Sequence, residues 1–270
     1  MTRRRKSSGG TEPKPVSFDL QKHAAEAIVE NIYAHTLGLA GHPPVFLGSA
    51  VAIRWTARGL ILTADHVIKG VEDNQILFAP RPPVSLKLNE GPQEKMSGRL
   101  HRLENLPVIR RYRDEEKDVA ALEVPLDLED QRPLLRFYDL SESSKLPRPM
   151  PENATMIGFP GDALEQPEPG VWTFSGHLLI AQPRRYAGQP LRGFSPRSNF
   201  LLGFAPAADG RKPHGFSGAG IWYQVNTPKA ALWTPKLSLL GICTDYYDRS
   251  QLLCALRIER ILTFLRRFVL

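Results

Sequence analysis

From residue 45 onward the chain is divided into short apolar or alternating runs of strand length, and this pattern constrains the fold more than any other feature. Proline, glycine and charged residues separate the runs, and most of the 24 prolines fall between them. Proline is tolerated there because its missing N–H group interrupts no sheet ladder. Eleven such runs with few helical segments predict an all-β fold closed around its core. The runs are residues 45–53, 60–64, 75–79, 84–88, 119–124, 155–159, 171–180, 201–205, 220–224, 237–244 and 252–256.

Helical periodicity is confined to the two ends of the chain. Apolar residues recur at every fourth position from Leu20 to Ile32 with charged residues opposite, and Ser17 suits an N-cap. We therefore expect an amphipathic helix over residues 17–40, after a basic tail over residues 1–16 that we expect to be disordered. The main interpretation is that this helix docks on the body. A helix that binds a protein partner is the alternative.

The composition is that of an ordinary soluble globular protein, with 42% hydrophobic and 23% charged residues. No uninterrupted apolar run approaches the ~18 residues of a membrane span. No apolar segment follows the basic N-terminus, as it would in a secretory signal. We therefore expect no membrane association and a cytoplasmic location.

Charge and cysteine content argue against several other classes. The net charge is +7, but four of the positive charges are Arg3 to Lys6 in the tail, and no basic face with interleaved aromatic residues follows. We therefore expect no nucleic-acid partner. The two cysteines, Cys243 and Cys254, lack metal-ligand spacing and are too few for a disulfide scaffold. We expect no metal, no cofactor and two buried thiols that lie opposite each other on neighbouring strands.

Three residues suggest nucleophilic catalysis. Ser217 lies in the glycine-rich turn Gly215-Phe216-Ser217-Gly218, His66 ends an apolar strand, and Asp118 enters another. A serine hydroxyl becomes an effective nucleophile when a neutral imidazole takes its proton. The imidazole in turn needs a carboxylate that orients it and stabilises its charged form. The order His, Asp, Ser is one of the known orders for this triad.

Residues 63–66, 118–120 and 215–218 resemble the three catalytic signatures of chymotrypsin-like (trypsin-fold) serine peptidases, with family-like spacing. The likeness extends over about residues 45–270 and is greatest to bacterial Deg/HtrA-type peptidase domains, although we expect no PDZ module. It rests further on residues 156–161 and 171–176, which are similar to the first strands of the second barrel, and on residues 240–244 and 253–256, which resemble the closing hairpin.

The resemblance implies two perpendicular β-barrels with an added helix at each end. The first barrel would span residues 41–147 and carry His66 and Asp118. The second would span residues 148–270, carry Ser217 and end in a C-terminal helix over residues 256–270.

The resemblance also implies a role for each site residue. Ser217 would attack the scissile carbonyl, His66 would act as base and then acid, and Asp118 would orient His66. The backbone N–H groups of Gly215 and Ser217 would form the oxyanion hole.

Four further residues would bind substrate or support the triad. The hydroxyl of Thr244 would support Asp118, while Asp245 and Tyr246 would lie on the strand edge where an extended substrate pairs. Arg211, in the loop before the nucleophile, would line the primary pocket and favour an acidic residue there; an exposed position is the alternative.

Two positions depart from the family pattern. Asp65 precedes the histidine where a small residue is usual, and its carboxylate would either be solvated or raise the pKa of His66. Phe216 stands where zymogen-activated members carry an aspartate. We therefore expect a site that needs no proteolytic activation, with the oxyanion loop ordered by burial of the Phe216 ring.

These observations predict a bacterial, cytoplasmic, cofactor-independent serine endopeptidase that acts on protein or peptide substrates. The main alternative is a weak or inactive peptide-binding or scaffolding module on the same fold. A third class, an esterase of the α/β-hydrolase type, would require alternating strands and helices and the order Ser, Asp, His, which the chain lacks.

Overall fold

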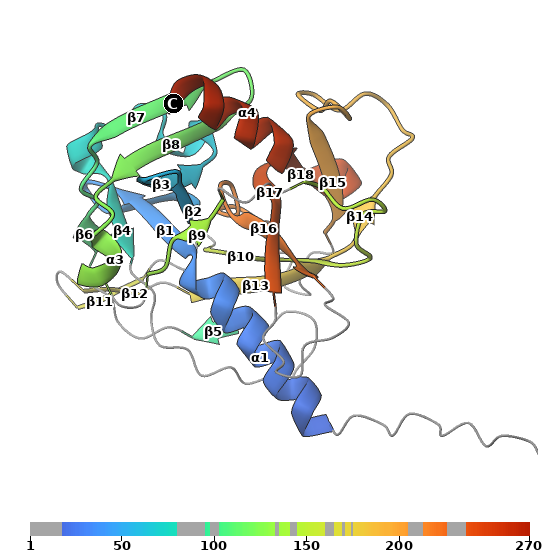
Figure 1. Ribbon diagram of the computed structural model, residues 1–270, viewed down its shortest axis with the longest axis horizontal. Helices are drawn as coiled ribbons and strands as arrows, with labels where there is room; N and C mark the ends of the chain where they lie inside the picture. Colours follow the sequence, from blue (N-terminus) through green and yellow to red (C-terminus); the bar gives the residue numbers. More distant parts are fainter. Residues whose placement is uncertain are drawn as a thin grey trace, which may run out of the picture.

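The protein is all-β, with two curled antiparallel sheets that form half-barrels and helices near both ends of the chain (Figure 1). A computed structural model describes residues 18–79, 95–97, 103–132, 135–140, 145–159, 165–168, 171–173, 175–204, 213–225 and 236–270. This architecture resembles the trypsin-like double-barrel fold and confirms the predicted fold class.

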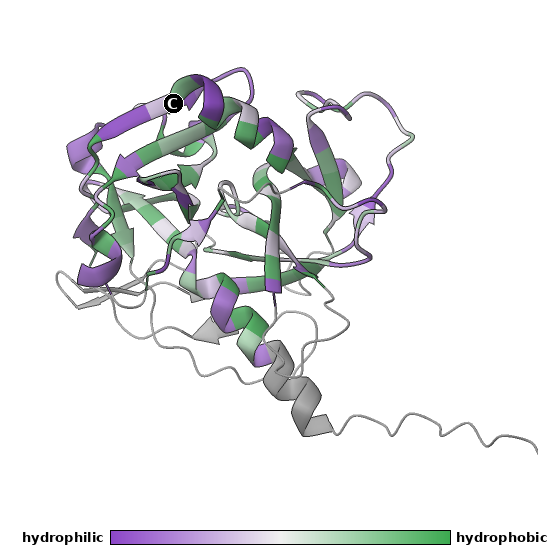
Figure 2. Ribbon diagram, viewed as in Figure 1, coloured by the Kyte–Doolittle hydropathy of each residue, from purple (hydrophilic) through white to green (hydrophobic). Residues whose placement is uncertain are grey.

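The first sheet has eight strands in the order β6-β4-β1-β2-β3-β8-β7, with β9 parallel to β2. Its central strands are apolar and buried, whereas β7 at the edge is mainly hydrophilic in Figure 2. The strands are β1 (Thr36–Gly41), β2 (Val45–Trp55), β3 (Arg58–Thr63), β4 (Leu77–Ala79), β6 (Glu104–Asn105), β7 (Arg110–Asp114), β8 (Val119–Val124) and β9 (Tyr138–Asp139).

The second sheet also has eight strands, in the order β14-β15-β18-β17-β16-β10-β13-β5. A separate two-stranded ribbon pairs β11 (Glu165–Glu168) with β12 (Val171–Thr173). The strands of the second sheet are β5 (Lys95–Ser97), β10 (Ala154–Gly158), β13 (Ser175–Ala181), β14 (Pro183–Arg184), β15 (Asn199–Gly203), β16 (Gly220–Val225), β17 (Lys236–Tyr247) and β18 (Leu252–Arg257).

The core has one large cluster that joins the two sheets and a smaller one within the first half-barrel. The larger cluster includes Val51 of β2 and Trp222 of β16. On β3, Leu60 and Leu62 belong to the larger cluster and Ile61 to the smaller one. This division follows from strand geometry, because successive side chains point to opposite faces. The first sheet is therefore covered on both faces.

The terminal helices pack on both sheets. Helix α1 (Phe18–Ala34) contacts β1, β10 and β17, and α4 (Ile258–Phe268) contacts β7, β17 and β18. Hydrophobic and hydrophilic bands alternate along α4 in Figure 2, and its buried residues include Ile261 and Leu265. Two one-turn helices, α2 (Asp65–Ile68) and α3 (Leu128–Gln131), belong to the first half. No helix in the described part of the chain is long and apolar enough to span a membrane.

The predicted helix over residues 17–40 is too long. Helix α1 ends at Ala34, where the Thr36 hydroxyl donates a hydrogen bond of 2.9 Å to the Ile32 carbonyl, and Thr36 opens β1. Residues 36–41 pair with β2, and their side chains are all buried. Pairing of this apolar segment in the sheet outweighs the helical periodicity that precedes it. The C-terminal helix likewise begins two residues later than predicted, because β18 continues to Arg257.

The two cysteines are not directly opposite each other, contrary to prediction. The register of β17 and β18 shifts at Thr244, so Cys243 pairs with Ala255 and Asp245 pairs with Cys254. A β-bulge of this kind inserts one extra residue in one strand and offsets the pairs beyond it. Both thiols are free and buried. Burial raises the pKa of both, to about 11 for Cys254, so they stay protonated at neutral pH.

Replacement of Gly241 in β17 tests how closely the β17 and β18 backbones approach. An added Cβ would lie 2.0 Å from the Leu256 carbonyl oxygen, so we expect Gly241→Ala to lower the free energy of unfolding by about 3 kcal/mol. The matched control is Gly41→Ala in β1, where the nearest atom would be 3.6 Å away. Urea unfolding of both variants measures the difference. Equal destabilisation would contradict the explanation.

Candidate active site

The side chains of His66 and Asp118 are held together by three contacts. His66 Nδ1 lies 2.8 Å from Asp118 Oδ2 and 3.0 Å from Oδ1, and the His66 backbone N–H donates to Oδ1 at 2.9 Å. His66 follows β3 and Asp118 precedes β8, and these two strands are paired through Thr63 and Ala120. Strand pairing thus brings together residues 52 positions apart. The His66 side chain is 50% exposed, so the imidazole is accessible to a substrate.

Asp65, which precedes the histidine, is occupied by a separate ion pair. Its carboxylate oxygens accept hydrogen bonds of 2.6 and 2.9 Å from the Arg113 guanidinium on β7. The Asp65 side chain is 5% exposed, so the expectation that it is solvated is wrong. The bidentate pair anchors α2 to the sheet.

The pKa of His66 is raised above its ordinary value of 6.5. The hydrogen bond with Asp118 is the largest cause, and partial burial acts in the opposite direction. The negative charges of Asp118, Asp245 and Asp65 raise the pKa further, with Asp65 contributing least. The protonated imidazole is therefore stabilised where it stands. A histidine that acts as a general base becomes positively charged during the reaction, and nearby carboxylates stabilise that charge.

Ser217 lies against the first sheet, close to the helix that carries His66. Its carbonyl oxygen accepts a hydrogen bond of 2.8 Å from the Ser49 N–H on β2. A Cβ added to Gly48 would lie 2.9 Å from that carbonyl and 2.8 Å from Val67, the residue after His66. The missing side chain at Gly48 thus allows the serine turn and α2 to approach the same point on β2.

The serine turn leaves two of its backbone N–H groups available. Phe216, Gly218 and Ala219 donate to the carbonyls of residues 213, 243 and 216, at 2.8 to 3.1 Å. Among the described residues, the N–H groups of Gly215 and Ser217 have no acceptor. These are the two donors predicted to form an oxyanion hole, where an N–H group must be left for the substrate.

Two glycines allow the turn to pack into the protein. Gly218 has φ +86°, and a Cβ there would meet the Ser49 carbonyl oxygen at 1.9 Å. Phe216 is 4% exposed, and a Cβ at Gly158 of β10 would lie 2.6 Å from its ring. The phenyl group therefore occupies space that Gly158 leaves open. Burial of Phe216 was expected from the sequence, whereas its contact with Gly158 was not.

Sequence reasoning missed Ser49, which joins the serine turn to both sheets. Its fully buried hydroxyl donates to the Gly215 carbonyl at 2.6 Å and accepts from the Phe159 N–H at 3.0 Å. In the sequence, the only indication of this role was that a hydroxyl residue interrupts the otherwise apolar first half of β2.

The Thr244 hydroxyl makes no hydrogen bond to Asp118, whereas the resemblance implied that it would. The hydroxyl donates to the Cys254 carbonyl at 3.4 Å, and Thr244 lies at the bulge, where it has no partner on β18. Both Thr244 and Asp118 nevertheless line one cavity of about 400 Å³, together with Asp245. The structure thus brings these residues to one place without the predicted hydrogen bond.

The end of β17 presents a sheet edge beside this cavity. Pairing of β17 with β16 stops at Ile242, whereas its pairing with β18 continues through Asp245 and Tyr246. The Tyr246 backbone N–H donates a hydrogen bond of 2.7 Å to the Asp245 carboxylate. Tyr246 packs edge-on against Phe204, with ring centroids 5.3 Å apart. Arg211, the other predicted substrate-binding residue, lies outside the described residues. No group of three or more metal-ligating side chains is found in the described part.

Comparison with known proteins identifies no family for this chain. No protein-family model matches it, and no curated protein matches it. Among solved structures 365 chains match. One comes from work on how "aromatic interactions drive the coupled folding and binding of the intrinsically disordered Sesbania mosaic virus VPg protein". The match has 12% identity and a TM-score of 0.42, and it covers 84% of this chain and 87% of that one.

The raised pKa of His66 can be measured through its ring protons. We expect an NMR titration to give a pKa above 6.5, and we expect Asp118→Asn to lower it because a negative charge and its hydrogen bond are lost. Asp127→Asn, which changes an exposed carboxylate elsewhere in the first half, is the control and should leave the value unchanged.

The sign of the linked stability effect follows from the same shift. Protonated His66 stabilises the folded state below the unfolded pKa, and this contribution is lost as the pH rises through the folded value. A His66 pKa that is unaffected by Asp118→Asn would contradict the assigned cause.

Removal of the Ser49 hydroxyl should destabilise the protein. We expect Ser49→Ala to cost about 1–3 kcal/mol, because the Gly215 carbonyl and the Phe159 N–H lose a buried partner. Ser250→Ala, at the β17–β18 turn, removes a hydroxyl with only a 3.4 Å contact and should change stability by less than about 0.5 kcal/mol. Thermal unfolding compares the two variants, and equal melting temperatures would refute the bridging role.

Proposed function

We propose that the protein is a serine endopeptidase that uses Ser217, His66 and Asp118 as a catalytic triad. The observation that carries the proposal is the paired His66 and Asp118 beside a serine turn whose Gly215 and Ser217 N–H groups lack an acceptor in the described chain. The His66–Asp118 pair can accept and return a proton. The N–H groups of Gly215 and Ser217 can donate hydrogen bonds to an oxyanion that forms during the reaction. Both are needed for acyl transfer.

In the proposed reaction, Ser217 Oγ attacks the substrate carbonyl carbon while its proton passes to His66 Nε2. The negative charge that forms on the carbonyl oxygen is stabilised by the N–H groups of Gly215 and Ser217. Asp118 holds Nδ1 and stabilises the imidazolium. His66 then gives the proton to the leaving amine, and the C–N bond breaks to leave an acyl-enzyme. Water, deprotonated by His66, hydrolyses the ester and restores the free hydroxyl.

The end of β17 beyond its pairing with β16 supports a polypeptide as the substrate. An extended chain would pair along the backbone at Asp245, as in other cases of strand addition. The adjoining cavity, which Asp118 and Asp245 line, offers room for a side chain. An endopeptidase needs such a site because it must hold residues on either side of the bond it cleaves.

No proteolytic activation step is required in this proposal. The ring of Phe216 is buried beside Gly158, and the turn is anchored to Ser49 and Cys243 by hydrogen bonds. These contacts order the serine turn without a buried N-terminal ammonium group. A bacterial, cytoplasmic setting remains part of the proposal.

Triad variants test the proposal through the coupling of their effects. We expect Ser217→Ala and His66→Ala each to lower the hydrolysis rate by about a million-fold, and the double variant to lose little more. Asp118→Asn should lose somewhat less, because the nucleophile and oxyanion donors remain. Release of new amino groups from denatured proteins measures the rate, and Ser250→Ala is the control that should retain activity.

A fluorophosphonate probe distinguishes this proposal from the alternatives. Labelling of Ser217 together with protein cleavage is the expected result. Labelling with turnover of esters alone would favour an esterase, and neither labelling nor cleavage would favour a peptide-binding module. Losses that multiply in the Ser217 and His66 double variant would exclude the triad.

A further inference from the structure

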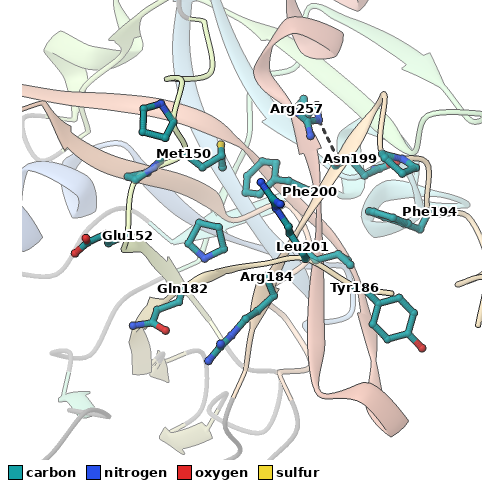
Figure 3. A pocket seen from close by; sticks show the side chains of 15 residues that line it. Met150, Glu152, Gln182, Arg184, Tyr186, Phe194, Asn199, Phe200, Leu201 and Arg257 are labelled. Atoms are coloured by element: carbon teal, nitrogen blue, oxygen red, sulfur yellow. Dashed lines mark hydrogen bonds between the residues drawn. The ribbon is translucent and has the colours of Figure 1, made fainter. Parts of the chain in front are cut away.

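A second hollow, separate from the cavity beside Asp118, lies at the β14 edge of the second sheet. It has a volume of about 840 Å³ and is formed by residues 149–152, the β14 segment, the loop that follows it, β15 and Arg257. We call it the arginine hollow. Figure 3 shows its lining, with Glu152 at one side and Tyr186 and Phe194 at the other.

The arginine hollow carries an excess of positive charge that no ion pair between described residues neutralises. Arg184, Arg185 and Arg257 line it against a single carboxylate, Glu152. Every ion pair between described residues lies between residues 54 and 136, so none involves these arginines. The sequence around Arg184 and Arg185, residues 169–208, contains no Asp or Glu. The Arg257 Nε–H donates to the Asn199 carbonyl at 2.9 Å (Figure 3), which holds this guanidinium at the hollow. Arginines without a carboxylate partner among the described residues favour a ligand that brings its own carboxylates or phosphates.

Apolar side chains in the lining of the hollow favour a peptide over a nucleic acid. Met150 is half-buried and Phe200 is 6% exposed. Single-stranded nucleic acids bind through successive exposed aromatic faces on which bases stack. Among the described residues of the lining, Tyr186 is the one exposed aromatic side chain, and Phe194 is half-buried against the Leu201 cluster. The lining instead suits one apolar side chain of a peptide, flanked by acidic residues that reach Arg184 and Arg185.

The arginine hollow and the cavity beside Asp118 lie on either side of one loop. Asn199 lines both the arginine hollow and the cavity beside Asp118, and the loop before it has Phe194 on one side and Arg192 on the other. This loop is held in place: Tyr247 Oη donates to the Arg192 carbonyl at 2.8 Å, and Phe194 packs against the Leu201 cluster. A chain bound at one site can therefore extend over this loop to the other.

We propose that the arginine hollow is an exosite that binds an acidic segment with an apolar residue, within the protein that the candidate active site cleaves. Its role in cleavage rests on the proposed function, but binding to the hollow does not. The segment's carboxylates pair with Arg184, Arg185 and Arg257, and its apolar side chain covers Phe200. Attachment here raises the local concentration of the substrate at Ser217.

A direct binding measurement tests the exosite. The probe is a fluorescein-labelled synthetic peptide of aspartates and glutamates around a central phenylalanine, and the protein is the full chain with Ser217→Ala, which prevents cleavage. We expect saturable binding by fluorescence anisotropy that weakens with added salt. Arg184→Ala combined with Arg185→Ala should weaken it by about tenfold or more. Both arginines are exposed, and circular dichroism checks that the variant folds.

The matched control is Arg266→Ala, an exposed arginine on α4 outside the hollow, which should change the affinity by less than about twofold. A peptide with asparagine and glutamine in place of the acids should bind at least about tenfold more weakly. No binding, or equal binding by the Arg184 and Arg185 variant, would overturn the exosite. Tighter binding of a single-stranded oligouridylate that displaces the peptide would overturn it in favour of a nucleic acid.

Fluorophosphonate labelling separates failure of this inference from failure of the proposed function. In the protein with Ser217 intact, labelling should be the same with and without the two arginine substitutions, because the probe does not occupy the hollow. Arginine-dependent peptide binding without labelling would retain the exosite and reject the peptidase. Labelling of Ser217 together with peptide binding that does not depend on Arg184 and Arg185 would retain the peptidase and reject the exosite.

Discussion

The docking of the serine turn on β2 is the contact on which the candidate site depends. The Ser49 backbone N–H donates to the Ser217 carbonyl, and the Ser49 hydroxyl links the Gly215 carbonyl to the N–H of Phe159, the residue that follows β10 of the second sheet. Gly218 fits against the Ser49 carbonyl only because it lacks a Cβ. His66 and Asp118 belong to the first half-barrel and Ser217 to the second, so this junction determines whether the three come together.

The two halves of the protein use their charges differently. In the first half, ion pairs such as Asp65–Arg113 neutralise charged groups and anchor the short helix that carries His66. In the second half, the arginines of the hollow have no carboxylate partner in the described chain. The ion pairs of the first half hold His66 in a fixed position, which proton transfer requires. The second half leaves these arginines available to the acidic partner that we propose.

Sequence patterns predicted strands well where burial is one-sided or complete. β3 and β8 are short apolar runs and were located within about two residues, the usual uncertainty of element ends. β7 was missed because its sequence, Arg110–Asp114, is mainly charged, and it becomes a strand by pairing with β8 and by the contacts of its arginines. β1 was assigned to a helix because its apolar residues follow directly on a helical periodicity that runs to Ile32. Its pairing with β2 could not be read from that segment alone.

The sequence by itself determined the all-β class, the residue types of the candidate triad and their order, because strand periodicity and glycine-rich turns are local properties. Only the tertiary structure decided that Asp65 pairs with Arg113, that the Thr244 hydroxyl donates to the Cys254 carbonyl and that Ser49 connects the two sheets. Each of these depends on a partner distant in the chain or on a one-residue bulge. Such contacts are selected by packing and by the need to pair buried polar groups, which act only once both sheets have formed.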